Sequence, residues 1–104
     1  MKVQVNTDKN IDGNVDLFSH VENVVGSSLS QFEDKITRVE AHLSDVNSSK
    51  SGGDDKRCVL EARMAGMQPI TVTHQAETLD HALYGASDKL KRALDNAVGK
   101  QRSR

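Results

Sequence analysis

The residues of this sequence best suited to metal binding or acid–base chemistry are four histidines and one cysteine. They are His20, His42, His74, His81 and Cys58. No two histidines are four residues apart, and neither the His-Glu-x-x-His nor the Cys-x-x-Cys pattern of a zinc site occurs. His74 and Cys58 fall at inward positions of predicted strands, where a partnered histidine and a small hydrophobic residue are expected. We therefore predict no metal site and no catalytic residue.

Motifs for nucleophilic catalysis and phosphate binding are also missing from the sequence. There is no Gly-x-Ser-x-Gly elbow, and Gly52–Gly53 lies in a polar stretch that does not lead into a helix. The only aromatic residues are Phe18, Phe32 and Tyr84, which leaves no large platform for stacked bases. We predict that the chain is not an enzyme and uses no cofactor or small-molecule substrate. An enzyme is the most remote alternative.

Positive charge gathers at the C-terminal end. Residues 1–87 hold 8 Lys/Arg against 13 Asp/Glu, whereas residues 88–104 hold 6 against 2. Such asymmetry is typical of a nucleic-acid contact, but cations also suit the C-terminal end of any helix, and charge alone favours this second interpretation. If nucleic acid is bound, the candidate residues are Lys89, Lys91, Arg92, Lys100, Arg102 and Arg104.

Residues 78–98 must position these charges, because their apolar residues recur at steps of three and four, as in a helix lying on a core. Thr78 is the expected N-cap, and Gly99 stands where the helix should end. Asp88 can reach Lys91 and Arg92 along the helix, and Lys91 can also reach Asp95. Residues 98–104 are then expected to form a basic tail.

An earlier helix is predicted over residues 15–32, with Asn14 or Asp12 as its N-cap. Strands with one apolar face are predicted over residues 2–6, 36–46, 57–66 and 70–75. Residues 47–56 contain no large apolar residue and should form a flexible hairpin loop. The polar faces of the second and third strands should pair by cross-strand ion pairs, among Arg38, Glu40, His42, Arg57, Glu61 and Arg63.

The order of these elements predicts one α+β domain, residues 1–104, with the order β-α-β-β-β-α. Because each strand has a single apolar face, we expect a four-stranded mixed sheet with both helices packed on one face. The first helix should cross over between two parallel strands, and the remaining strands should be antiparallel. The absence of long apolar runs, of a signal peptide and of paired cysteines predicts a cytoplasmic protein without a membrane segment.

Two stretches, LSQFEDKITRVEAHLSDVN and TLDHALYGASDKLKRALD, resemble the ribosome hibernation promoting factors, also described as ribosome-associated translation inhibitors. The resemblance implies the β-α-β-β-β-α fold, binding to the rRNA of the small ribosomal subunit in the channel used by messenger and transfer RNA, and repression of translation under stress in idle cells. It places ribosome-facing charge on Lys89 and Arg92. Since the sequence ends at Arg104, it resembles the short members of the family.

This sequence departs from the family pattern at two places. A further basic position of the closing helix falls on Asn96, and residues 14–34, where relatives commonly carry several Lys/Arg, contain none. They hold Asp16, Glu22, Glu33 and Asp34 instead. Because phosphate contacts supply most sequence-independent affinity for RNA, two hypotheses stay open. The chain is a non-enzymatic factor that occupies the decoding channel, or it is a protein-interaction module that kept the fold and lost rRNA binding.

Overall fold

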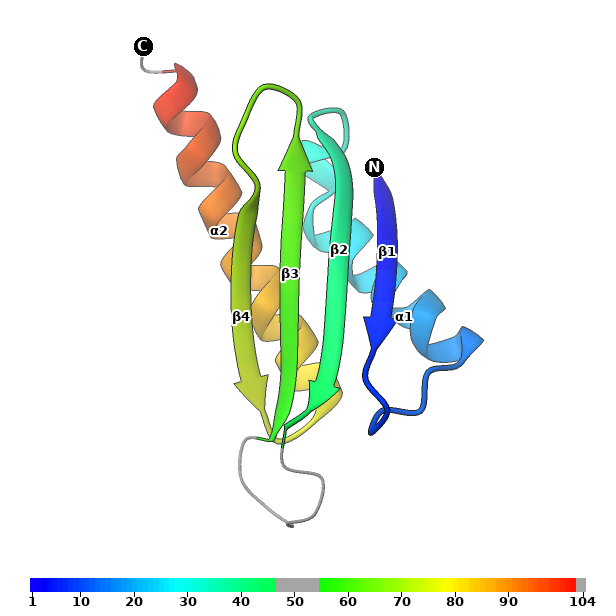
Figure 1. Cartoon of the computed structure of the whole chain (residues 1–104). Helices are drawn as coiled ribbons and strands as arrows, with labels where there is room; N and C mark the ends of the chain where they lie inside the picture. Colours follow the sequence, from blue (N-terminus) through cyan, green and yellow to red (C-terminus); the bar gives the residue numbers. More distant parts are fainter. Residues whose placement is uncertain (47–54, 103–104) are drawn as a thin grey trace.

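The computed structural model describes residues 1–46 and 55–102, the last two through their backbone alone (Figure 1). The elements in chain order are β1 (Lys2–Thr7), α1 (Val15–Ser28), a short 3-10 turn η1 (Ser30–Phe32), β2 (Ile36–Asp45), β3 (Lys56–Met64), β4 (Ile70–Ala76) and α2 (Leu79–Arg102). The predicted α+β fold and element order are therefore confirmed.

The four strands form one mixed sheet in the order β1-β2-β3-β4. β1 runs parallel to β2, with α1 as the crossover between them, and β2, β3 and β4 are antiparallel neighbours. Both helices lie behind the same face of the sheet, which leaves the other face open (Figure 1). This arrangement follows from the alternation of the strands, since each has a single apolar face to bury.

The core lies between this face and α2. Leu83, Leu90 and Leu94 of α2 are at most 2% exposed, and they belong to one hydrophobic cluster with inward residues of β2 and β3 that are equally buried. Both helices begin with the predicted caps. The Asn14 side chain accepts a hydrogen bond from the Leu17 amide at 2.9 Å, and the Thr78 hydroxyl accepts one from the His81 amide at 3.1 Å.

Two helix ends differ from the prediction. α1 ends at Ser28, and the chain continues through η1, which buries Phe32 without extending the α-helix. α2 passes through Gly99 and runs to Arg102. Val98, only 8% exposed, packs against the core just before Gly99. Packing of this turn offsets the roughly 1 kcal/mol by which glycine disfavours a helix, so part of the expected basic tail is helical.

The predicted hairpin loop over residues 47–56 overlaps β3 by one residue. Residues 47–54 lie outside the described part of the chain, but Asp55 is 8% exposed and Lys56 begins β3. The Asp55 carbonyl accepts a hydrogen bond from the Val46 amide at 2.8 Å. The Lys56 ammonium lies 3.0 Å from Asp55 and 3.4 Å from Asp45, and the hydrogen bond to Asp55 is the main cause that raises the pKa of Lys56.

Cys58 is completely buried at an inward position of β3, as predicted. Loss of hydration raises the pKa of its thiol from an ordinary value of 9.0 to about 12. Well below pH 9 the thiol is neutral in both the folded and the unfolded chain. Between these two pKa values only the unfolded chain releases the proton, so rising pH favours unfolding.

We expect the wild-type protein to lose about 1.4 kcal/mol more stability than Cys58→Ala when the pH rises from 8 to 10, because one pKa unit corresponds to that free energy. Urea unfolding of both proteins at the two pH values measures this difference. The other titrating groups are common to both proteins and cancel. Equal losses in the two proteins would show that the Cys58 thiol is hydrated in the folded state.

His74, on the inward side of β4, lies directly under Gly85 of α2. A β-carbon on residue 85 would overlap the His74 ring. Glycine is therefore required in this helix for close approach to the strand, although it lowers helix propensity. The His74 ring, at its inward strand position, thus packs against the backbone of α2.

Gly85→Ala should destabilise the wild-type protein by about 1–3 kcal/mol, because the added methyl group forces the His74 ring to move. In a His74→Ala background the same substitution should stabilise by up to about 1 kcal/mol, since only the gain in helix propensity remains. Urea unfolding of the four proteins gives both values. Destabilisation of the same size in both backgrounds would contradict the contact as the cause.

Candidate nucleic-acid interface

Five of the six basic residues predicted to contact nucleic acid are carried by α2, but those whose side chains are described do not share one surface. Lys89 and Lys91 point about 160° apart around the helix axis, since each residue turns it by about 100°. The Lys89 ammonium donates a hydrogen bond to the Thr73 carbonyl on β4 at 2.9 Å. Lys89 therefore covers the edge strand of the sheet, where a free carbonyl would invite pairing with another chain.

Lys91 lies on the opposite side of α2, toward α1. It shares a strip of the helix with Tyr84 and Asp95, which are seven residues before it and four after it. The Asp95 carboxylate accepts a hydrogen bond from the side-chain amide of Gln31 in η1, at 2.9 Å. The predicted contact between Lys91 and Asp95 is thus replaced by one that ties α2 to the segment after α1.

Arg92 forms the predicted pair with Asp88, four residues earlier, at 3.0 Å. Both side chains are largely exposed, so this pair contributes little stability and does not prevent Arg92 from reaching a phosphate. Within residues 1–46 and 55–100, no ion pair involves Lys91 or Lys100. Arg102 is placed on α2 through its backbone, and Arg104 lies outside the described residues.

The seam between α1 and α2 is closed by polar contacts between residues far apart in the chain. His20 Nε2 of α1 lies 2.8 Å from Asp80 Oδ1 at the start of α2. The Gln31–Asp95 hydrogen bond closes the other end of the seam. The first contact joins the N-terminal halves of the two helices, and the second joins the segment after α1 to the C-terminal half of α2. The two helices therefore run in the same direction along the sheet (Figure 1).

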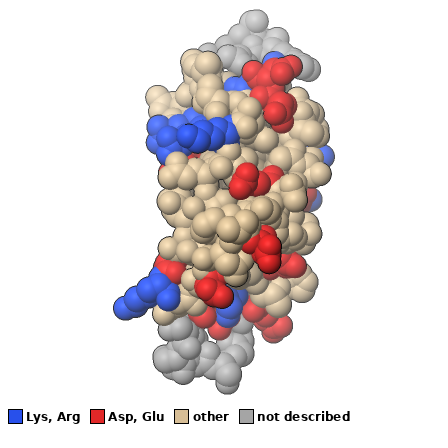
Figure 2. All heavy atoms as spheres, turned by 90° about the vertical axis from the view of Figure 1, so that its right-hand side faces the viewer, with Lys and Arg blue, Asp and Glu red and all other residues tan. Residues whose placement is uncertain are grey.

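The surface of α1 is acidic, as its sequence indicated. Asp16 and Glu22 are exposed, and so are Glu33 and Asp34 after the helix. Figure 2 shows the side of the molecule formed by β1 and α1, where carboxylates are spread along the face and lysines and arginines lie mainly toward its margins. Phosphates approaching along α1 would meet like charge.

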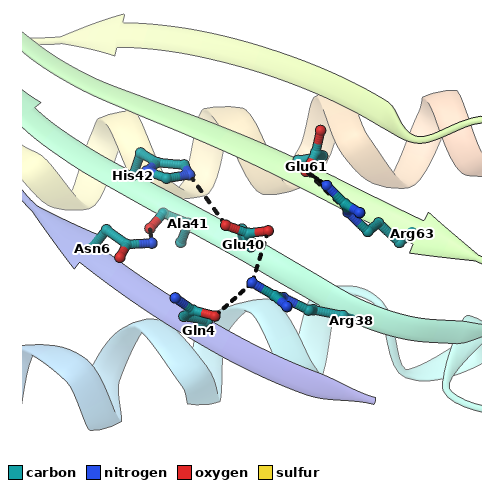
Figure 3. A network of polar contacts seen from close by, with 8 residues as sticks. All are labelled: Gln4, Asn6, Arg38, Glu40, Ala41, His42, Glu61 and Arg63. Carbon is teal, nitrogen blue, oxygen red and sulfur yellow. Dashed lines mark hydrogen bonds and ion pairs between the residues drawn. The ribbon is translucent and has the colours of Figure 1, made fainter.

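The open face of the sheet carries a polar network on β1 and β2 (Figure 3). The Arg38 guanidinium lies 3.0 Å from Glu40 and donates a hydrogen bond to Gln4 at 2.7 Å. His42 lies 3.7 Å from the same Glu40 carboxylate. Arg38 is thus partly neutralised on its own strand, and its contact across to β1 is made with an amide.

The prediction of ion pairs between β2 and β3 on this face is wrong, because the observed pairs form within each strand. The register between β2 and β3 sets Arg38 opposite Arg63 and Glu40 opposite Glu61. Like charges directly opposite each other repel, so Arg38 and Arg63 each pair along their own strand, Arg38 with Glu40 at 3.0 Å and Arg63 with Glu61 at 3.2 Å. Arg57 instead donates to Gln75 on β4 at 3.1 and 3.3 Å. This mixture of paired charges does not form a basic surface for RNA.

The described residues contain no cluster of three or more His, Cys, Asp or Glu side chains that could hold a metal ion. Neither helix over residues 1–46 and 55–102 combines the length and the apolar character needed to span a bilayer. What remains as a candidate interface is the helical side of the molecule. There, Lys91 faces the seam between the two helices, whereas Arg92 lies about 100° further around α2 and Lys100, nine residues after Lys91, lies on the opposite side of the helix.

A family model described as sigma 54 modulation protein / S30EA ribosomal protein matches residues 5–102. The chain belongs to this family. The resemblance seen in the two sequence stretches, to ribosome hibernation factors, is thereby confirmed. No curated protein matches the sequence.

Two solved structures share the fold of this S30EA family member. The N-terminal domain of Protein Y from Thermus thermophilus superposes with a TM-score of 0.73 at 17% identity, over 92% of this chain and 98% of that one. A ribosomal subunit interface protein from Coxiella burnetii superposes with a TM-score of 0.61 at 14% identity, over the whole of both chains. At such low identity these similarities establish the fold alone.

Proposed function

We propose that this S30EA family member binds the small ribosomal subunit, occupies its decoding channel and represses translation by steric exclusion, without catalysing a reaction. The observation that carries the proposal is the family match over nearly the whole chain. The solved structures with the same fold are named as Protein Y and as a ribosomal subunit interface protein, which agrees with action at the ribosome.

The residues proposed to contact rRNA phosphates are Lys91, Arg92 and Lys100, with Arg102 and Arg104 continuing the same end of the chain. Lys91 and Lys100 have no ion-pair partner among the described residues, and Arg92 has only an exposed one. Lys89 is bound to the sheet edge, so we assign it a smaller part than the resemblance alone implies. Because few phosphates are contacted and α1 is acidic, binding should be weak and its dependence on salt modest.

The second candidate is a protein-interaction module that has lost rRNA binding. The observation favouring it is the exposed surface of α1, which carries Asp16 and Glu22 and no lysine or arginine. Such a surface suits a basic protein partner better than a phosphate backbone. The two candidates differ in how binding responds to salt and to single charges.

Binding of the wild-type protein to purified small subunits should weaken with salt, with a log–log slope on the order of −2 to −3 for about three phosphate contacts. Lys91→Ala and Lys100→Ala should each flatten the slope by about 0.7–0.9. Lys2→Ala is the matched control, because it removes one exposed positive charge from the edge strand β1 and should leave the slope unchanged. Co-sedimentation across a salt series measures all four.

A reversal of charge on α1 tests the same proposal from the other side. Glu22→Lys should tighten small-subunit binding and steepen the slope, because it exchanges repulsion for a phosphate contact. It should also lower the concentration that inhibits translation in a reconstituted system. If wild type and Glu22→Lys both fail to sediment with subunits at low salt, the second candidate replaces the first.

A further inference from the structure

A groove of about 370 Å³ opens along the seam between α1 and α2. It is lined by His20, Asn23, Val24, Ser27 and Ser28 of α1 and by Tyr84 of α2. The α1 residues recur at steps of three and four, so they form one face of that helix, turned toward α2. The volume lies in the usual range of small-ligand sites.

Tyr84 is an aromatic side chain presented to solvent in this groove, with 51% of its surface exposed. Its ring forms an edge-to-face contact with His20, with ring centroids 6.4 Å apart and planes at 81°. His20 is held in turn by Asp80 at 2.8 Å. His20 and Asp80 thus support one side of an aromatic ring that is not part of the core.

The rest of the lining is mostly uncharged and able to form hydrogen bonds. Asn23 offers an amide, which both donates and accepts, and Ser27 and Ser28 offer hydroxyls. Val24, 9% exposed, supplies an apolar patch. A flat aromatic ligand with donors and acceptors on its edge matches this lining, and a nucleobase has this chemistry.

The surrounding charge argues that a base, and not a phosphate, is the group that enters. Asp80 lies at the groove, and Glu22 is exposed on the same helix as most of its lining. The nearest predicted phosphate contact is Lys91, on the same strip of α2 as Tyr84 and about 11 Å further along the axis, from seven residues at 1.5 Å each. A strand whose backbone contacts Lys91 can therefore place one base against Tyr84.

We propose that this groove binds one unstacked nucleobase of single-stranded RNA, stacked on Tyr84 and hydrogen-bonded by Asn23 and the neighbouring serines. The inference rests on the proposed function, since it takes the RNA to be exposed rRNA of the small subunit. It adds a contact that is independent of salt to the few phosphate contacts of α2. One ring is sufficient for one base, although the chain has no larger stacking platform.

Tyr84 is the only tyrosine of the chain, so a tyrosine-labelled sample gives a single set of ring resonances that report on this groove. Titration with a hexaribonucleotide of adenosine should shift these resonances upfield and saturably. The same oligomer with its bases removed should leave them in place. Ring resonances unmoved by either oligomer would overturn the proposal.

Small-subunit binding supplies the second readout. Tyr84→Ala should weaken binding by about 5- to 100-fold, as expected for the loss of one stacked base, with the salt slope unchanged. Tyr84→Phe should restore most of the affinity, because stacking needs the ring and not the hydroxyl. Val15→Ala, which trims an exposed apolar side chain at the other end of α1, is the matched control and should have no effect.

The outcomes separate this proposal from the proposed function. If wild type binds subunits and Tyr84→Ala binds equally well, the groove proposal fails and the function stands. If wild type does not bind subunits but its tyrosine resonances shift with the oligomer, the base site stands and the ribosomal function fails. If the tyrosine resonances shift with whole subunits but not with the RNA oligomer, the groove binds a ribosomal protein, and the proposal is overturned.

Discussion

The structure depends on one constraint: the sheet has a single apolar face, and α2 must cover most of it. Leu83, Leu90 and Leu94 lie over β3 and its neighbours, with almost no exposed surface. α1 is left to cover the remainder beside β1, so the two helices meet along a seam on one side of the molecule. The separation of a charged open sheet from a helical side follows directly from this packing.

Much of the fold was predictable because each element shows its own hydrophobic period. Alternation identified the strands, and steps of three and four identified the helices. What could not be predicted depends on contacts distant in sequence. Ile36 is buried although alternation would turn it outward, because the β2–β3 register shifts between Ile36 and Arg38. α2 continues through Gly99 because Val98 packs on the core, which outweighs a local signal for a helix end.

The candidate site was predictable only in part, because basic residues that are close in the sequence point to different sides of the helix. Lys89 and Lys91 are near neighbours in the chain, yet one binds the edge of β4 and the other faces α1. The groove was missed altogether, since His20 and Tyr84 meet only after the helices pack side by side. The spacing of Asn23, Ser27 and Ser28 gave a weak signal, a polar stripe next to the apolar face of α1, but nothing in it indicated a partner on α2.

The central claim is that the helical side, and not the open sheet, faces rRNA. Cys58 is buried, so an introduced cysteine is the reactive thiol, and an iron chelate can be attached at Asn96→Cys on α2 or at Thr71→Cys on β4. Hydroxyl radicals released from position 96, in complexes formed at low salt, should cleave small-subunit rRNA around the decoding channel, whereas those from position 71 should cleave it far less. Stronger cleavage from position 71, or cleavage from neither position in a complex that sediments intact, would contradict the account.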